Sequence, residues 1–124
     1  MKLSALDALL SREISAAAFS ASIADELETY RRGLEEPGRS APVCVIEDQT
    51  VAVTHEDTKL LCHLFANGQL GSSELAYIAD AMQLAERVEF TDSWVADVVA
   101  EFTDPAINGT FTVARALELS GDGA

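Results

Sequence analysis

The sequence contains few of the residues with which small proteins form stabilising disulfides or bind structural metal ions. Its 124 residues include only two cysteines and two histidines, while 48% are apolar. That apolar fraction is enough for a hydrophobic core without disulfide or metal staples, and the length is that of one domain. Both cysteines, Cys44 and Cys62, have apolar neighbours in the sequence. We therefore expect two buried free thiols and no disulfide.

Long hydrophobic runs are also missing. The uncharged stretch 14–24 is too short to cross a bilayer, which takes about 20 predominantly apolar residues. Lys2 is soon followed by Asp7, where a secretory signal would have a long apolar segment. These features predict a cytoplasmic protein that does not bind membranes.

The usual motifs of catalysis and zinc binding are absent from the sequence. It has no Gly-x-Ser-x-Gly motif and no glycine-rich phosphate loop. His55 and His63 lie near one face of an expected helix, but no second pair of ligands has zinc-site spacing. We therefore predict no enzyme activity, no catalytic or metal-binding residues and no cofactor.

One segment resembles an EF-hand calcium loop, which would begin at Asp104. Asn108 and Gly109 fall at the fifth and sixth positions of that loop. Ala106 and Arg115, however, occupy the third and twelfth positions, where calcium needs oxygen ligands. We therefore predict that this segment does not bind calcium.

Basic residues are scarce and acidic residues are concentrated in the middle of the chain. The sequence has 8 basic and 21 acidic residues, for a net charge of −13. Residues 47–104 hold twelve of the acidic residues against only Lys59 and Arg87, a net charge of −10. Such a field repels nucleic acid and anionic lipid and attracts a basic protein surface. The same charge would also serve solubility alone.

Apolar residues recur every three or four positions over most of the chain, which predicts a mainly α fold of five to six short helices. The expected helix starts are marked by capping residues at Ser15, Thr54, Ser72 or Ser73, Asp92 and Thr112. The expected inward positions are Leu3, Leu6, Leu9 and Leu10; Phe19, Ile23, Leu27 and Tyr30; Leu60, Leu61, Leu64 and Phe65; Leu75, Ile78, Ala79 and Met82; Val95, Val98, Val99 and Phe102; and Val113, Ala116 and Leu117.

One stretch has strand-like composition. Residues 43–46 and 50–53 are rich in β-branched side chains and flank a short polar turn, which predicts a small β-hairpin at 43–53. Residues 89–91 are expected to be a simple connection. We therefore predict a single domain over 1–124. It comprises an N-terminal helical hairpin at 1–33, the β-hairpin, and an acidic helical portion at 54–120.

Two expected helices carry aromatic and acidic residues together. Trp94, Asp97 and Glu101 recur at helical spacing opposite the valine stripe of their helix, and Tyr77 and Asp80 do so on the preceding helix. Aromatic side chains ringed by acids suit a contact with a basic protein, because buried Trp and Tyr dominate interface energetics. We predict that these five residues form the partner-binding surface. The alternative is that Trp94 and Tyr77 fold back into the core.

Three parts of the sequence resemble small bacterial immunity proteins of toxin–immunity systems. They are residues 60–81, the short segment 88–90, and residues 104–109. The opening residues 10–19 are similar to the start of colicin-type immunity proteins, in which a leucine-rich helix, a turn and an acid-containing helix follow one another. The resemblance implies an acidic helical protein that neutralises a basic nuclease toxin. The expected hairpin at 43–53 departs from that pattern.

These observations together predict a protein-binding inhibitor, most specifically an immunity or antitoxin protein with a basic toxin nuclease as its partner. Two alternatives remain open at the level of sequence. One is an acidic structural or regulatory helical module without a toxin partner. The other is a phage-type mimic of nucleic acid, which would carry its acidic residues in a regular row.

Overall fold

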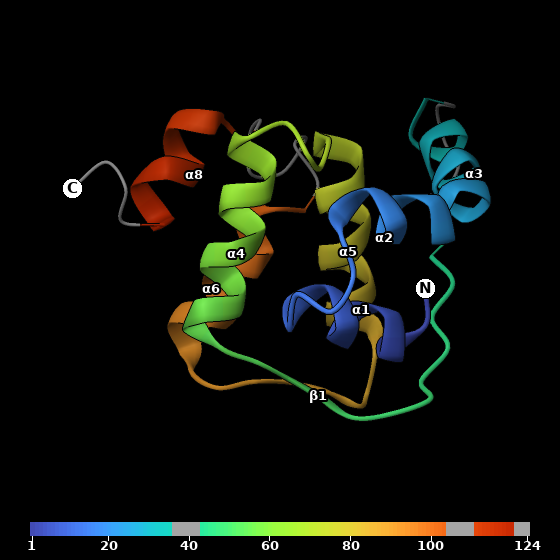
Figure 1. Ribbon diagram of the computed structural model, residues 1–124, viewed down its shortest axis with the longest axis horizontal. Helices are drawn as coiled ribbons and strands as arrows, with labels where there is room; N and C mark the ends of the chain where they lie inside the picture. The colour runs from blue at the N-terminus through green and yellow to red at the C-terminus, as the bar shows by residue number, and fades with distance from the viewer. Residues whose placement is uncertain (36–42, 104–110, 121–124) are drawn as a thin grey trace.

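The computed structural model describes residues 1–35, 43–103 and 111–120 (Figure 1). This described part contains seven helices and one two-stranded parallel sheet, so the prediction of a mainly α fold is confirmed. The elements are α1 (Leu3–Leu10), α2 (Ala16–Ser22), α3 (Ala24–Glu35), β1 (Val51–Val53), α4 (His55–Ala66), α5 (Ser72–Leu84), β2 (Val88–Phe90), α6 (Ser93–Glu101) and α8 (Val113–Ser120). None of the helices in those ranges is long and apolar enough to cross a membrane.

Local capping chemistry places most helix starts where the sequence predicts them. The side chains of Ser15 and Asp92 each accept a hydrogen bond from the backbone N–H three residues further on. Thr54 and Asp57 form a reciprocal capping box at the start of α4. Helix α5 differs, because its N-cap is Gly71 and not a serine. These caps satisfy N–H groups that have no partner within their helix.

The N-terminal region holds one helix more than the sequence predicts. The single helix expected to run from Ser15 to about Gly33 is divided at Ile23, whose backbone (φ −111°, ψ 9°) leaves the helical region. Ser22 Oγ bonds to a carbonyl of the preceding turn, and Ser20 donates a short hydrogen bond across to Glu74 of α5. Serine side chains that compete with the backbone in this way weaken a helix, and here they accompany the break.

The predicted hairpin at 43–53 is wrong. Strand β1 pairs in parallel with β2, in the register Val51↔Val88 and Val53↔Phe90. Residues 43–46 do not pair with β1. Ile46 instead forms an isolated parallel bridge with Lys2.

The residues between the two halves of the expected hairpin bond elsewhere in the molecule. Asp48 accepts hydrogen bonds from the backbone N–H and the hydroxyl of Ser4 on α1. Glu47 accepts one from the backbone N–H of Arg87, directly before β2. These long-range bonds hold residues 43–46 beside α1 and β1 beside β2. The prediction of extended backbone in this stretch is therefore correct, and the prediction of which segments pair is wrong.

The core confirms most of the inward positions. The predicted inward residues of α1, of α2 and α3, of α5 and of α6 are buried. On α4, Leu61 is buried, and Leu60, Leu64 and Phe65 are half-buried. The cysteines differ from expectation, because Cys62 is buried and Cys44 is exposed, and both are free thiols.

The side of helix α8 that faces the core differs in part from the predicted side. Of its three predicted inward residues, Ala116 is fully buried as expected, but Val113 and Leu117 are 47% and 38% exposed. Ser120, one turn after Ala116, is buried as well, so the small side chains form the packed face. In Figure 1 the red α8 lies beside the green α4, and the two helices pack more extensively than any other pair in the described part. Small side chains allow this close approach, because the distance between packed helices depends on the side chains at the contact.

Candidate protein-binding face

Two helices begin side by side because of the parallel sheet. Strands β1 and β2 run in the same direction, so their carboxyl ends lie at one edge, and Thr91 N–H donates to Val53 O there. Helix α4 starts directly after β1 and α6 starts directly after β2. His55, the first residue of α4, is thereby brought to Asp92 and Trp94 at the start of α6.

His55, Asp92 and Trp94 form one connected cluster. The imidazole of His55 stacks on the indole of Trp94, with ring centroids 4.4 Å apart and planes inclined by 11°. His55 Nε2 lies 2.5 Å from Asp92 Oδ2. The Asp92 carboxylate also accepts the Val95 N–H, and this bond together with the one to His55 holds the pKa of Asp92 below its ordinary value. Trp94 is half-buried, because its side chain packs against the core as well as against His55, so it lies between the two alternatives of the sequence analysis.

Asp97 follows Trp94 after about one turn of α6. Its side chain is exposed, and within residues 1–35, 43–103 and 111–120 nothing donates a hydrogen bond to its carboxylate. Trp94 and Asp97 are separated by helical spacing, so they lie on neighbouring positions of one side of α6. Among the described residues, Asp97 is thus a negative charge without a partner, on the same side of α6 as Trp94.

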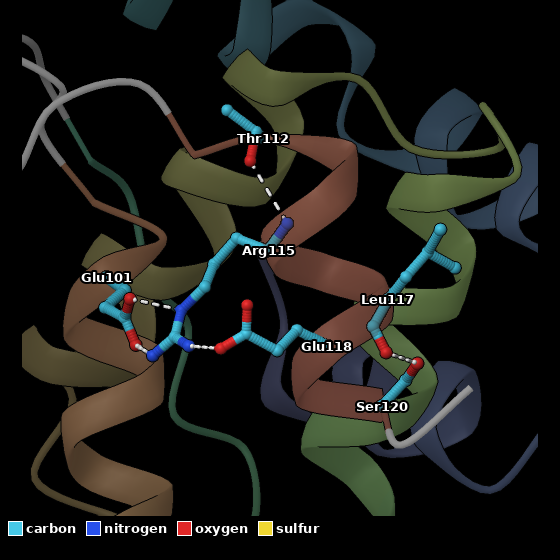
Figure 2. Close-up of polar contacts among 6 residues, drawn as sticks. All are labelled: Glu101, Thr112, Arg115, Leu117, Glu118 and Ser120. Atoms are coloured by element: carbon cyan, nitrogen blue, oxygen red, sulfur yellow. Dashed lines mark hydrogen bonds and ion pairs between the residues drawn. The ribbon is translucent and has the colours of Figure 1, made fainter. Parts of the chain in front are cut away.

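Glu101 lies one further turn along α6 and is paired with the chain's own arginine (Figure 2). Arg115 of α8 forms a bidentate ion pair with it, with Nε 3.0 Å from Oε1 and Nη2 3.1 Å from Oε2. Arg115 Nη1 also lies 2.6 Å from Glu118 Oε1. The hydrogen bonds to Glu101 raise the pKa of Arg115 above its ordinary value. Because two parallel hydrogen bonds join the guanidinium to the carboxylate, they fix the relative orientation of the two side chains, and this fixes α8 against α6.

We call the surface made by His55, Asp92, Trp94, Asp97 and Glu101 the α6 face. Of the five residues that the sequence assigns to partner binding, it contains three. His55 and Asp92 were missed as members. Asp92 was predicted only as a cap and His55 only as a solvated helix residue, since no local signal joins positions so far apart. Their contact depends on the unpredicted parallel pairing of β1 with β2.

Tyr77 does not lie on a partner-binding surface, so this part of the prediction is wrong. Its side chain is fully buried, and its hydroxyl donates to Cys44 O and accepts from Cys44 N–H, each at 3.2 Å. Its ring packs edge-on against Tyr30 at 5.1 Å, and burial raises the pKa of Tyr77 to about 12. Helix α5 is buried over most of its circumference, which leaves no outward side for this residue.

Asp80 is half-buried and lies apart from the α6 face. It accepts a 2.7 Å hydrogen bond from the hydroxyl of Tyr30 on α3. Figure 1 shows α3 and α8 at opposite ends of the long axis of the molecule. The carboxylates of Asp80 and Glu101, which bond to those two helices, therefore do not form one surface. Asp80 has a structural role at the α3–α5 contact.

No group of three or more His, Cys, Asp or Glu side chains in the described ranges is arranged to hold a metal ion. Most of the calcium-like segment lies outside those ranges, and Arg115, at its last position, is engaged by Glu101. Comparison of the chain with protein-family models, curated proteins and solved structures finds no significant match. Function is therefore inferred from the residues themselves.

Proposed function

We propose that this chain is a protein-binding inhibitor that covers a basic surface of its partner with the α6 face. The observation that carries the proposal is the stacked His55–Trp94 pair next to the free carboxylate of Asp97. An aromatic pair offers apolar contact area at an interface, and an unpaired exposed carboxylate offers a charge to a cation of the partner.

The charge of the whole middle segment supports the same proposal. The net charge of −10 over residues 47–104 would attract a basic protein and raise the rate of encounter. The resemblance to immunity proteins narrows the partner to a basic toxin, most specifically a nuclease domain. In that role the chain would act by covering the cationic surface with which the nuclease binds its substrate.

The test uses a charge reversal at the free carboxylate. The partners to use are purified basic nuclease domains of toxins, beginning with any that is encoded directly upstream of the gene for this chain. We expect Asp97→Lys to slow association by about tenfold at low salt, because like charges then meet at the interface. The difference should shrink in high salt, where exposed charges are screened within about 3 Å at 1 M.

Asp7→Lys is the matched control. Asp7 is an exposed carboxylate on α1, and its reversal changes the net charge by the same amount. It should leave the association rate near that of the parent. If Asp97→Lys and Asp7→Lys associate equally fast, the α6 face is not the interface. If no nuclease of this kind binds or is inhibited, the acidic field serves solubility and the proposal is wrong.

A further inference from the structure

A hollow of about 350 Å³ lies between the α1–α2 connection and α4, and none of its lining residues belongs to the α6 face. Its wall combines apolar side chains with two charged ones: Leu9, Ile14, Leu60, Leu64, Arg12 and Glu13. Leu9 is buried, whereas Ile14, Leu60 and Leu64 are only half-buried. The volume falls near the lower end of small-molecule pockets, which span about 300–1,000 Å³.

Arg12 occupies this site in a backbone conformation that favours glycine. Its φ is +64°, in the left-handed region, directly after the end of α1. The backbone N–H of Arg12 bonds to Leu9 O and that of Glu13 to Ala8 O, which together close the end of the helix. Glycine is the residue usually found at such a position, because a side chain there carries a backbone cost.

The hollow has two charged side chains in its wall, Arg12 and Glu13. Arg12 and Glu13 are exposed, and neither forms an ion pair within the described part of the chain. Other basic residues, such as Arg32 and Arg115, pair with acidic neighbours. A cation, an anion and an apolar wall are thus available at one place.

We propose that this hollow binds a free aliphatic α-amino acid. The apolar wall would take the side chain, Arg12 the carboxylate and Glu13 the ammonium group. The net charge of the protein and the two charged side chains favour a zwitterion over a ligand with a single charged group. A plain carboxylate is repelled by a net charge of −13, and a plain amine makes no use of Arg12. A zwitterion carries no net charge and can pair with both residues.

The experiment is a titration of the purified chain with L-leucine up to about 20 mM, followed by amide chemical shifts and fitted to a dissociation constant. Three probes each remove one part of the ligand: 4-methylpentanoate lacks the ammonium group, 3-methylbutylamine lacks the carboxylate, and glycine lacks the apolar side chain. We expect saturable shifts around the hollow with L-leucine. Each of the three probes should bind at least about tenfold more weakly.

Two variants test the charged residues separately. Arg12→Gly removes the guanidinium and suits the left-handed backbone, so folding should be retained while L-leucine binding falls by at least about tenfold. Glu13→Gln should weaken binding in the same way. Arg31→Gln and Glu86→Gln, at exposed positions elsewhere, are the matched controls and should bind as the parent does.

The proposal fails if L-leucine causes no saturable shifts over this range. It also fails if the probes bind as well as L-leucine, since the hollow would then be merely apolar. Retention of full binding by Arg12→Gly or by Glu13→Gln would likewise overturn it. None of these outcomes bears on the nuclease-binding proposal, because the hollow shares no residue with the α6 face.

Discussion

At the scale of single residues, two cysteines with similar sequence neighbours have different environments. Cys62 lies on α4 inside the core, and burial raises the pKa of its thiol to about 12. Cys44 lies in the extended segment beside α1, where its backbone bonds to Tyr77 and its side chain is exposed. Apolar neighbours therefore predicted burial correctly on a helix and wrongly in an extended segment, whose side chains alternate between two faces.

This difference predicts selective thiol chemistry. A thiolate is the reactive form, so exposed Cys44 should react with a thiol reagent at pH 8 while Cys62 reacts only after unfolding. Absorbance with an aromatic disulfide reagent should show one fast thiol per chain, and two in denaturant. Cys44→Ser should abolish the fast phase. Rapid labelling of Cys62 in the native protein would show that the α4 core opens readily.

Trp94, the only tryptophan, provides a second prediction at this scale. It is half-buried between His55 and the edge of the core, so Trp94→Ala should cost about 1–2 kcal/mol of unfolding free energy, less than the 3–5 kcal/mol of a fully buried tryptophan. Binding to the nuclease partner should fall by more than stability does. Urea denaturation and association rates on the same samples separate the two effects. A loss of 3 kcal/mol or more, approaching the core range, would assign Trp94 to the core.

At the scale of elements, α8 is positioned by small residues on one side and by an ion pair on another. Ala116 and Ser120 form its buried face, and Arg115 holds Glu101 of α6 (Figure 2). The apolar periodicity of the sequence predicted Ala116 correctly, but it also assigned Val113 and Leu117 to the inward side and missed Ser120. Close packing of two helices favoured the small side chains at the contact and left the larger ones outside.

This packing predicts a position-dependent response to the same substitution. Ala116→Leu should destabilise the protein by about 1–3 kcal/mol, because extra volume does not fit between α8 and α4. Ala114→Leu, on the exposed side of α8, should change stability by less than about 0.5 kcal/mol. Chemical denaturation of both variants is the measurement. Equal effects would mean that α8 does not pack through Ala116 in solution.

At the scale of the whole molecule, buried groups with raised pKa values link stability to pH. The pKa of Cys62 is raised from 9.0 and that of Tyr77 from 10.0, each to about 12. In the unfolded chain both groups release their protons at lower pH than in the folded protein. The stability they contribute is therefore fully present below pH 9 and is lost as pH rises toward 12.

Alkaline denaturation checks this linkage. The unfolding free energy, measured in urea from pH 7 to about 11, should be flat at first and then decline above about pH 9. Cys62→Ala should reduce the steepness of the decline, because it removes one of the two groups. Cys44→Ala serves as the control and should leave the slope unchanged. A decline that ignores the Cys62 substitution would mean that this thiol ionises alike in both states.

Local chemistry explains how much of the fold followed from the sequence. The caps at Ser15, Thr54 and Asp92 act over three residues, and an apolar stripe repeats within one helix. Both signals lie wholly inside one segment, so the starts of α2, α4 and α6 and the buried sides of most helices were predictable. The break at Ile23 was not, because it accompanies a bond from Ser20 to Glu74 on another helix.

What the sequence by itself determined is the mainly helical fold, its caps and the acidic middle. Only the tertiary structure decided which distant residues meet. A β-branched composition indicates a strand but does not name its partner. Because the entropic cost of loop closure grows only slowly with length, pairing with a near segment has little advantage over pairing with a distant one. Strand β1 accordingly pairs with β2 and not with residues 43–46. That choice brought His55 to Trp94. The burial of α5 on nearly all sides placed Tyr77 in the core. The residues that α6 contributes to the α6 face could therefore be predicted, because helical spacing is set within one segment. Their contacts with residues of other elements could not, because helix packing depends on the whole fold.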